Sequence, residues 1–250
     1  MSNSIYPNPN KLLELSGIET KLIGFYDVND TKPFEPFTES QRCFFECYND
    51  WQRGYSTLIS LSNASCQGGG YWIGGIIPAW AEKSAGELSS IESFAYKLNQ
   101  REGFKSSDEI MCKVFDNLKP YSIKNKYAVI APFNINQYEY LKTITFYVNP
   151  DQLSLLILGA EYNNSSLKEN PVITTFGSGC GEMVAVLENL DHQIPKAVIG
   201  ATDIAMRQHL PPEILAFTVN KPMFRQLCEL DEQSFLGKPF WERLKKARTE

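Results

Sequence analysis

The sequence lacks any long apolar run and any leader-like beginning. No stretch of the 250 residues approaches the roughly 20 apolar residues that a membrane-spanning helix needs. The opening segment, MSNSIYPNPNKLLEL, has no basic region followed by an apolar run, so it does not resemble a secretory signal. We therefore predict a cytoplasmic protein with no membrane partner.

An excess of positive charge is also missing. The chain has 24 Lys and Arg against 29 Asp and Glu, which gives a net charge of −5. A groove that follows nucleic-acid phosphates needs clustered Lys and Arg. The only basic run, from Arg243 to Arg248, lies at the C-terminus, where it complements the negative end of the last helix. We therefore expect no nucleic-acid partner.

Cysteine is too scarce for a disulfide scaffold, since the chain has six. Cys43 and Cys47 are four residues apart and would share one face of a helix, but a zinc site needs two further ligands. No second closely spaced Cys/His pair exists. We therefore predict that these two thiols pack in the core and that no structural metal site exists. A metal or cluster held by Cys66, Cys180 and one helical cysteine stays open, and the sequence does not identify a cofactor.

The chain does contain enough apolar residues for a packed core, because 43% are hydrophobic and 21% are charged. Strands are expected at 21–25, 55–61, 127–133, 143–148, 172–176, 197–199 and 214–219. Helices are expected at 10–16 (capped by Asn10), at 40–54, over much of 78–118 and at 182–190. Further helices are expected to begin at 150, to run from after 200 to 209, to follow 219, and to lie near the C-terminus. Strands that alternate with helices predict an α/β class, with α+β as the alternative. We expect one domain over residues 1–250, with a mixed sheet flanked by helices.

Cys180 is the main candidate for chemistry. It follows a predicted strand in the segment TTFGSGCGEM, where Gly177, Gly179 and Gly181 permit a tight turn before a helix expected from about Glu182. A helix N-terminus there would stabilise a thiolate or bind an anion. The structural alternative is a small apolar residue beneath a tight turn. Glu182 adds a carboxylate beside the thiol or simply suits the first helical turn.

A second candidate is the glycine-rich segment CQGGGYWIGG, which begins at Cys66 and includes Gly68 and Gly69. So much glycine costs conformational entropy unless the backbone must approach a ligand or another strand closely, and we expect a loop there. The segment matches neither a Walker loop nor the dinucleotide fingerprint. Ligand contact and backbone packing are equally compatible with it.

The third candidate is GATDIAMR, residues 200–207. Thr202 or Asp203 can cap the helix that follows the strand. Arg207 would then lie one turn inside that helix, where it could reach an anion above the sheet or form a surface salt bridge. The two histidines, His192 and His209, lie at helix ends, and a pairing of one of them with Cys180 stays open.

The order of several segments resembles the domain-of-unknown-function 169 family, also described as uncharacterised ArCR. The resemblance is carried by Arg42-Cys43, Cys66 with Gly68 and Gly69, TFYVNPDQLSLLILGAEY, Cys180-Gly-Glu182, GATDIAMR and EILAFTVNKPMFRQL. The family supplies no reaction. It implies an Arg in a Gly-Asp-Arg-like segment, which corresponds here to residues 201–207, a stretch with less glycine.

These residues together favour a small-molecule binding protein whose ligand is anionic. Cys66 and Cys180 would line the site, glycine backbones would surround the ligand, and Arg42 or Arg207 would neutralise its charge. If the protein is an enzyme, Cys180 is the nucleophile or redox thiol. The alternatives are a non-catalytic interaction or regulatory protein, and a thiol or metal sensor. A homo-oligomeric state stays open.

Overall fold

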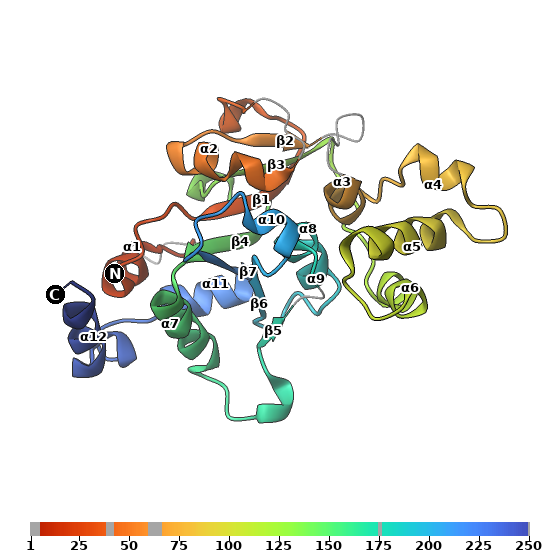
Figure 1. The fold of residues 1–250 in the computed structure, drawn as a ribbon. Coiled ribbons are helices and arrows are strands. Elements are labelled where there is room, and N and C mark those ends of the chain that lie inside the picture. The colour runs from red at the N-terminus through yellow and green to blue at the C-terminus, as the bar shows by residue number, and fades with distance from the viewer. Residues whose placement is uncertain (1–5, 39–42, 60–66, 175–176, 250) are drawn as a thin grey trace.

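The structure, a computed structural model, describes residues 6–38, 43–59, 67–174 and 177–249. These residues build a seven-stranded sheet in the order β2-β3-β1-β4-β7-β6-β5 (Figure 1). The strands are β1 (Ile23–Val28), β2 (Thr57–Ile59), β3 (Tyr127–Pro132), β4 (Leu141–Val148), β5 (Val172–Thr174), β6 (Ala197–Gly200) and β7 (Leu215–Asn220). Neighbouring strands are antiparallel except β5 and β6, which are parallel. The predicted mixed α/β class is confirmed.

The sheet has a hydrophobic core on each face, because its central strands are buried on both sides. Successive side chains of a strand point to opposite faces. Phe25 and Tyr147 therefore pack in one core, whereas their neighbours Tyr26 and Phe146 pack in the other. Continuous apolar runs, such as the one in β3, are typical of strands covered on both faces.

Different helices cover the two faces. On the Tyr26 face lie α1 (Asn10–Ser16), α7 (Pro150–Glu161), α11 (Lys221–Cys228) and α12 (Pro239–Thr249). On the Phe25 face lie α2 (Tyr48–Arg53), α3 (Gln67–Gly74), α4 (Ala79–Lys83), α5 (Ser90–Glu102), α6 (Asp108–Asn117), α8 (Gly179–Met183), α9 (Ala185–Glu188) and α10 (Ile204–Arg207). No helix among the described residues combines the length and apolar character that crossing a bilayer requires.

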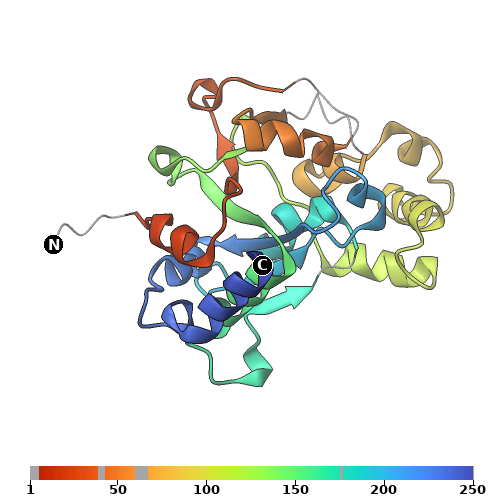
Figure 2. The ribbon, with the colours of Figure 1, turned by 60° about the vertical axis from the view of Figure 1, so that its left-hand side comes forward.

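Helices α4, α5 and α6 extend from the sheet as a lobe, which Figures 1 and 2 both place beside α8–α10. Aromatic side chains connect this lobe to α3. The ring of Tyr71 stacks on that of Phe115 with centroids 4.8 Å apart, and Phe94 packs against Tyr71 at 5.3 Å. The lobe is thus attached to the sheet through a packed aromatic cluster.

Three local expectations need correction. The helix predicted over residues 40–54 is a 3-10 turn (Phe44–Cys47) followed by α2, and residues 40–42 lie outside the described residues. Helix α1 begins as expected, but the side chain that binds its first turn is that of Asn8, which accepts a hydrogen bond from the backbone N–H of Asn10 at 3.0 Å. The glycine-rich segment expected to be a loop forms helix α3.

Candidate functional site

A cavity of about 400 Å³ lies between the helical lobe and the sheet, where α3, α5, α8 and α10 meet. It is lined by residues from five separate segments of the chain: Cys43, Phe45, Gln67, Gly68, Leu98, Arg101, Glu102, Phe104, Ser178, Cys180, Asp203, Ala205, Met206, Gln208 and His209. The structure therefore brings Cys180, Gly68 and several residues of the segment 203–209 into one hollow.

Cys180 reaches this cavity because the chain turns sharply after β5. Gly177 adopts a φ of +110°, which a residue with a side chain rarely accommodates. Helix α8 then begins at Gly179, three residues before the predicted start, and is five residues long. Such a short helix is a weak dipole, so the predicted stabilisation of a thiolate by a helix N-terminus loses its basis. Cys180 is 7% exposed and lies on the cavity wall.

Gly179 is needed for packing rather than for ligand contact. A Cβ atom at this position would lie 2.9 Å from Cε2 of Phe45 and 3.1 Å from Cγ of Met206. Its backbone N–H donates a hydrogen bond to Oδ2 of Asp203 at 3.2 Å. Neither Gly179 nor Gly181 is among the described residues that line the cavity.

Asp203 connects the two short helices at the cavity wall. Its Oδ1 accepts the N–H of Ala205 at 2.9 Å, which confirms the predicted cap of α10, while Oδ2 accepts the N–H of Gly179 in α8. Burial raises the pKa of the Asp203 carboxyl above its ordinary value, and the nearby charge of Glu102 raises it further. An acid group that holds its proton more tightly than usual therefore shares the wall with Cys180.

Glu182 lies behind the cavity wall rather than on it. Its carboxyl is 2% exposed and accepts the backbone N–H of Ala201, with Oε2 at 2.6 Å and Oε1 at 3.0 Å. Ala201 adopts a left-handed φ of +59°, and a Cβ at Gly200 would lie 1.6 Å from Oε2 of Glu182. Burial raises the pKa of Glu182 well above its usual range. This carboxyl thus fixes the turn that carries Asp203.

The two glycines singled out in α3 differ in role. Gly68 lines the cavity, and a Cβ there would meet no atom within 4 Å. Gly69 faces the core instead, where a Cβ would lie 2.1 Å from Cε2 of Phe44. Glycine at 69 is therefore explained by close packing of a helix on a ring, whereas Gly68 leaves the cavity open.

Of the two arginines that were candidates for ligand binding, Arg207 does not line the cavity and Arg42 lies outside the described residues. Arg207 donates hydrogen bonds to the carbonyl oxygens of Ile214, Pro211 (3.3 Å) and Pro212 (2.6 Å), so its guanidinium closes the loop after α10. It is not among the described lining residues. Arg42 and Cys66 lie outside the described residues.

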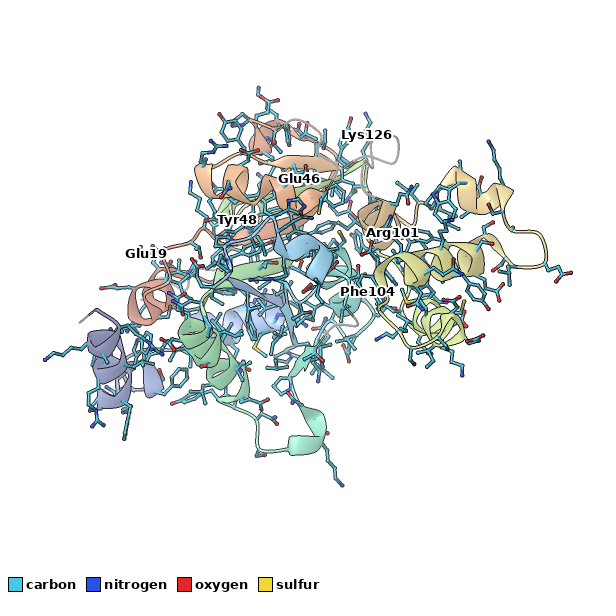
Figure 3. All side chains as sticks on the ribbon, viewed as in Figure 1. Glu19, Glu46, Tyr48, Arg101, Phe104 and Lys126 are labelled. Carbon is cyan, nitrogen blue, oxygen red and sulfur yellow. The ribbon has the colours of Figure 1, made fainter. Side chains whose placement is uncertain are left out.

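Among the described residues that line the cavity, the basic side chains are those of Arg101 and His209, and the sequence marks neither as a binding residue. Nε of Arg101 lies 2.5 Å from Oε1 of Glu102, and Nε2 of His209 lies 3.9 Å from Oε1 of Glu46. Figure 3 shows Arg101 and Phe104 on the side of the lobe that faces α8 and α10, with Glu46 near α10. Arg101 looks in the sequence like any charged residue at a helix C-terminus, so no sequence signal marks it. His209 was noted only as one possible partner of Cys180, and the structure does bring both to one cavity.

The five described cysteines, Cys43, Cys47, Cys112, Cys180 and Cys228, are thiols. Cys47 is fully buried in the core as predicted, and burial raises its pKa. Cys43 is half-buried, packs against the same core and also lines the cavity, because a 3-10 turn separates it from Cys47 and the two do not share a helical face. Across the described residues, no group of three or more His, Cys, Asp or Glu could hold a metal ion.

The fold and the cavity define a mixed α/β protein with one ligand-sized hollow between its sheet and its helical lobe. Residues 11–229 match the domain-of-unknown-function 169 family, described as uncharacterised ArCR, and the chain belongs to this family. Neither a curated protein nor a solved structure matches the chain significantly.

Proposed function

We propose that this protein binds a small organic molecule with an apolar body and an anionic end in the cavity between the lobe and the sheet. The observation that carries the proposal is that side chains from the segments 67–68, 98–104, 178–180 and 203–209, distant in the chain, contribute to one hollow of about 400 Å³. Ligand pockets typically occupy about 300–1,000 Å³ and combine apolar walls with a few polar groups.

The lining supports this ligand chemistry. Phe45, Leu98, Phe104 and Met206 supply an apolar surface, Arg101 supplies a cationic group, and His209 supplies an imidazole that can donate a hydrogen bond. The guanidinium of Arg101 forms an ion pair with the carboxylate of Glu102, so its attraction for an anionic ligand is reduced. An anionic end near Arg101 and His209 would leave the apolar body against the aromatic rings and bring the molecule close to Cys180. In this proposal Arg101 and His209, rather than Arg207, contact the anionic end of the ligand.

Cys180 is the reactive group in the enzymatic form of the proposal. The thiol shares the wall with Asp203, whose raised pKa suits it to carry a proton. A reactive thiol of this kind persists in a reducing compartment, which is consistent with the proposed cytoplasmic location. A small molecule remains the proposed partner, rather than a nucleic acid, because the chain carries a net charge of −5.

Alkylation by iodoacetamide, mapped by mass spectrometry, tests the proposal with internal controls. Phenylacetate and octanoate serve as probes because each combines an apolar body with a carboxylate. Binding in the cavity should slow the alkylation of Cys43 and Cys180 but leave Cys112 unchanged, since Cys112 is half-buried elsewhere, on α6. Equal slowing at all three thiols, or none at Cys180, would contradict the proposal.

Variants of the wall separate binding from reaction. Gly68→Leu should block the cavity and remove the protection by the probes, whereas Gly68→Ala should retain it, because a single Cβ there meets open space. Cys180→Ser should leave probe binding measurable by calorimetry and abolish any turnover of a substrate. If Gly68→Leu binds the probes as tightly as the wild type, the ligand does not occupy this cavity.

A thiol sensor is the second candidate, and it is favoured by the presence of Cys43 and Cys180 on the same wall. In that case hydrogen peroxide would oxidise the two thiols to a disulfide, with two water molecules as the product. The intact mass would fall by the mass of two hydrogen atoms, and neither Cys43→Ser nor Cys180→Ser would show that loss. A protein that only mediates interactions would show neither ligand protection nor this oxidation.

A further inference from the structure

A second cavity, of about 230 Å³, lies at the other end of β6 and β7, and three lysines are part of its lining. The first cavity adjoins the end of β6 near Gly200, whereas the second adjoins Asn220 at the end of β7. Its lining is Lys124, Leu141, Lys142, Glu188, His192, Asn220, Lys221 and Pro222. Three lysines thus line one cavity in a protein whose overall charge is negative.

The sheet register forces two of these lysines together. Thr143 pairs with Asn220 across the antiparallel strands β4 and β7. Lys142 precedes Thr143 in β4 and Lys221 follows Asn220 as the first residue of α11, so the two lysines flank the last pair of this ladder. Two like charges this close repel each other. Burial lowers the pKa of the Lys221 amine, and the adjacent charges of Lys142 and Arg225 lower it further.

The carboxylates of Glu139 and Glu188 offset only part of this repulsion, because the pKa of Lys221 stays lowered despite their charges. Within the described parts of the chain, none of Lys124, Lys142 and Lys221 forms an ion pair within 4.0 Å. The one acidic group in the lining, Glu188, lies 3.7 Å from Nδ1 of His192. Nζ of Lys221 donates one hydrogen bond to the carbonyl oxygen of Glu139 at 2.9 Å and lies 5.1 Å from the centre of the Tyr138 ring, so a ligand would share this ammonium group with both.

The backbone of α11 contributes little at this cavity, so the amines would be the main donors. Asn220 caps the helix, and its side chain is already used: Oδ1 accepts from Met223 and Lys196, and Nδ2 donates to Ile194. Pro222 in the first turn has no N–H. A doubly charged oxyanion would satisfy several lysines at once and remove their mutual repulsion.

We propose that this second cavity binds the phosphate group of a small phosphorylated molecule or free phosphate, through Lys124, Lys142 and Lys221. The cavity would hold about eight waters at their share of liquid volume, which is enough for a phosphate and a short carbon skeleton. The site is separate from the cavity of the proposed function, and neither depends on the other.

Thermal unfolding in sodium phosphate, compared with sodium chloride at the same pH and ionic strength, tests this site. At a tenfold excess over its dissociation constant, phosphate should raise the Tm of the wild type by about 3 °C relative to chloride. Lys142→Gln and Lys221→Gln should lose this rise. Lys113→Gln, which removes an exposed lysine on α6, is the charge-matched control and should keep it.

A second readout distinguishes a ligand site from simple screening of charge. Lys142→Gln should have a higher Tm than the wild type in chloride, because it removes the repulsion with Lys221, yet a lower response to phosphate. A larger shift with glycerol 3-phosphate than with inorganic phosphate assigns the site to a phosphorylated metabolite, and the reverse assigns it to free phosphate. Equal stabilisation by phosphate and chloride, an equal effect of succinate, or a phosphate response retained in Lys142→Gln would overturn the proposal.

Discussion

At the scale of single residues, Glu182 shows how a buried acid can support a site without touching its ligand. Its carboxyl accepts the N–H of Ala201 and holds the left-handed turn that leads to Asp203. Gly200 gives it room, since any Cβ at that position would collide with Oε2. The sequence marks Glu182 only as an acidic residue near Cys180, because a partner 19 residues further along the chain is invisible to local patterns.

The raised pKa of Glu182 gives a pH-dependent contribution to stability. Its folded-state pKa lies above the ordinary 4.5, so the native protein binds the proton more tightly than the unfolded chain. The resulting stabilisation is complete below about pH 4.5. It decreases as the pH rises and is lost as the pH passes the raised pKa.

Glu182→Gln removes this titration while Asp203 titrates in both proteins. We expect the free energy of unfolding of the variant, relative to the wild type, to increase as the pH rises from about 4.5 toward the raised pKa of Glu182. Urea unfolding at several pH values measures it. A difference between the two proteins that is constant with pH would show that Glu182 is not protonated in the fold.

Asp27 is a second buried acid, and its role is structural. It is 1% exposed, and its oxygens accept hydrogen bonds from the Tyr121 hydroxyl at 2.5 Å and from the backbone N–H groups of Lys124 (2.7 Å) and Asn125 (2.8 Å). Asp27→Asn would turn an NH₂ group toward these donors and leave at least one unsatisfied. We expect a loss of about 2–3 kcal/mol in the free energy of unfolding.

The control for Asp27 is the nearby exposed Asp30, whose Oδ1 accepts only the N–H of Lys32. Asp30→Asn should change the free energy of unfolding by less than about 1 kcal/mol in the same denaturant titration. Equal effects of the two substitutions would contradict a special role for the buried carboxyl.

At the scale of elements, helix α3 is a glycine-rich segment in which two of the glycines, Gly68 and Gly69, should respond in opposite ways to substitution. Gly69 lies against the ring of Phe44, so Gly69→Ala should overpack the core and cost about 1–3 kcal/mol. Gly68 faces the open cavity, so Gly68→Ala should gain up to about 1 kcal/mol from helix propensity. Urea unfolding of the two variants checks this opposite behaviour. A similar loss in both would mean that the helix requires backbone freedom at both positions.

The same helix shows what sequence patterns can and cannot predict. The continuous apolar run predicts β3 within a few residues, because burial on both faces leaves a strong signal, and the alternation of Thr with apolar residues likewise predicts β4. The glycines of α3 were predicted as a loop, since propensity alone disfavours a helix there. Close packing on Phe44 outweighs that propensity, and a ring more than 20 residues away in the chain gives no local signal.

Only the part of the candidate site that depends on local sequence patterns could be predicted. Cys180, Gly68 and the Asp203 cap follow from turns and capping residues, which are local in the sequence. Arg101 and Phe104 reach the cavity only because the lobe folds against α8 and α10. Arg207 was expected to face the ligand, but three carbonyl groups in the loop after α10 attract its guanidinium. Such long-range geometry requires the structure.

At the scale of the whole molecule, the first cavity exists because the lobe is held against the sheet layer. Beyond the aromatic cluster, one polar connection joins the two parts where α6 ends. Asn189 accepts the N–H of Lys119 at 3.0 Å through Oδ1 and donates to its carbonyl oxygen at 2.7 Å through Nδ2. Nδ2 of Asn189 also donates a hydrogen bond to the carbonyl oxygen of Ala185 in α9, so Asn189 connects the segment that follows α6 to the helices that pack on the sheet.

Asn189→Ala should therefore loosen the lobe more than it weakens the fold. These bonds are solvent-exposed, so we expect a loss of only about 1 kcal/mol in the free energy of unfolding. Amide hydrogen exchange should become faster in α5 and α6 and stay unchanged in α7 and α11, because the latter helices pack on the opposite face of the sheet.

Asn164→Ala, which removes hydrogen bonds to Glu161 and Ser166 at the end of α7, is the matched control and should leave exchange in the lobe unchanged. Faster exchange throughout the molecule in Asn189→Ala would instead mean that lobe and sheet open as one cooperative unit, and that the cavity between them cannot widen for a ligand without global unfolding.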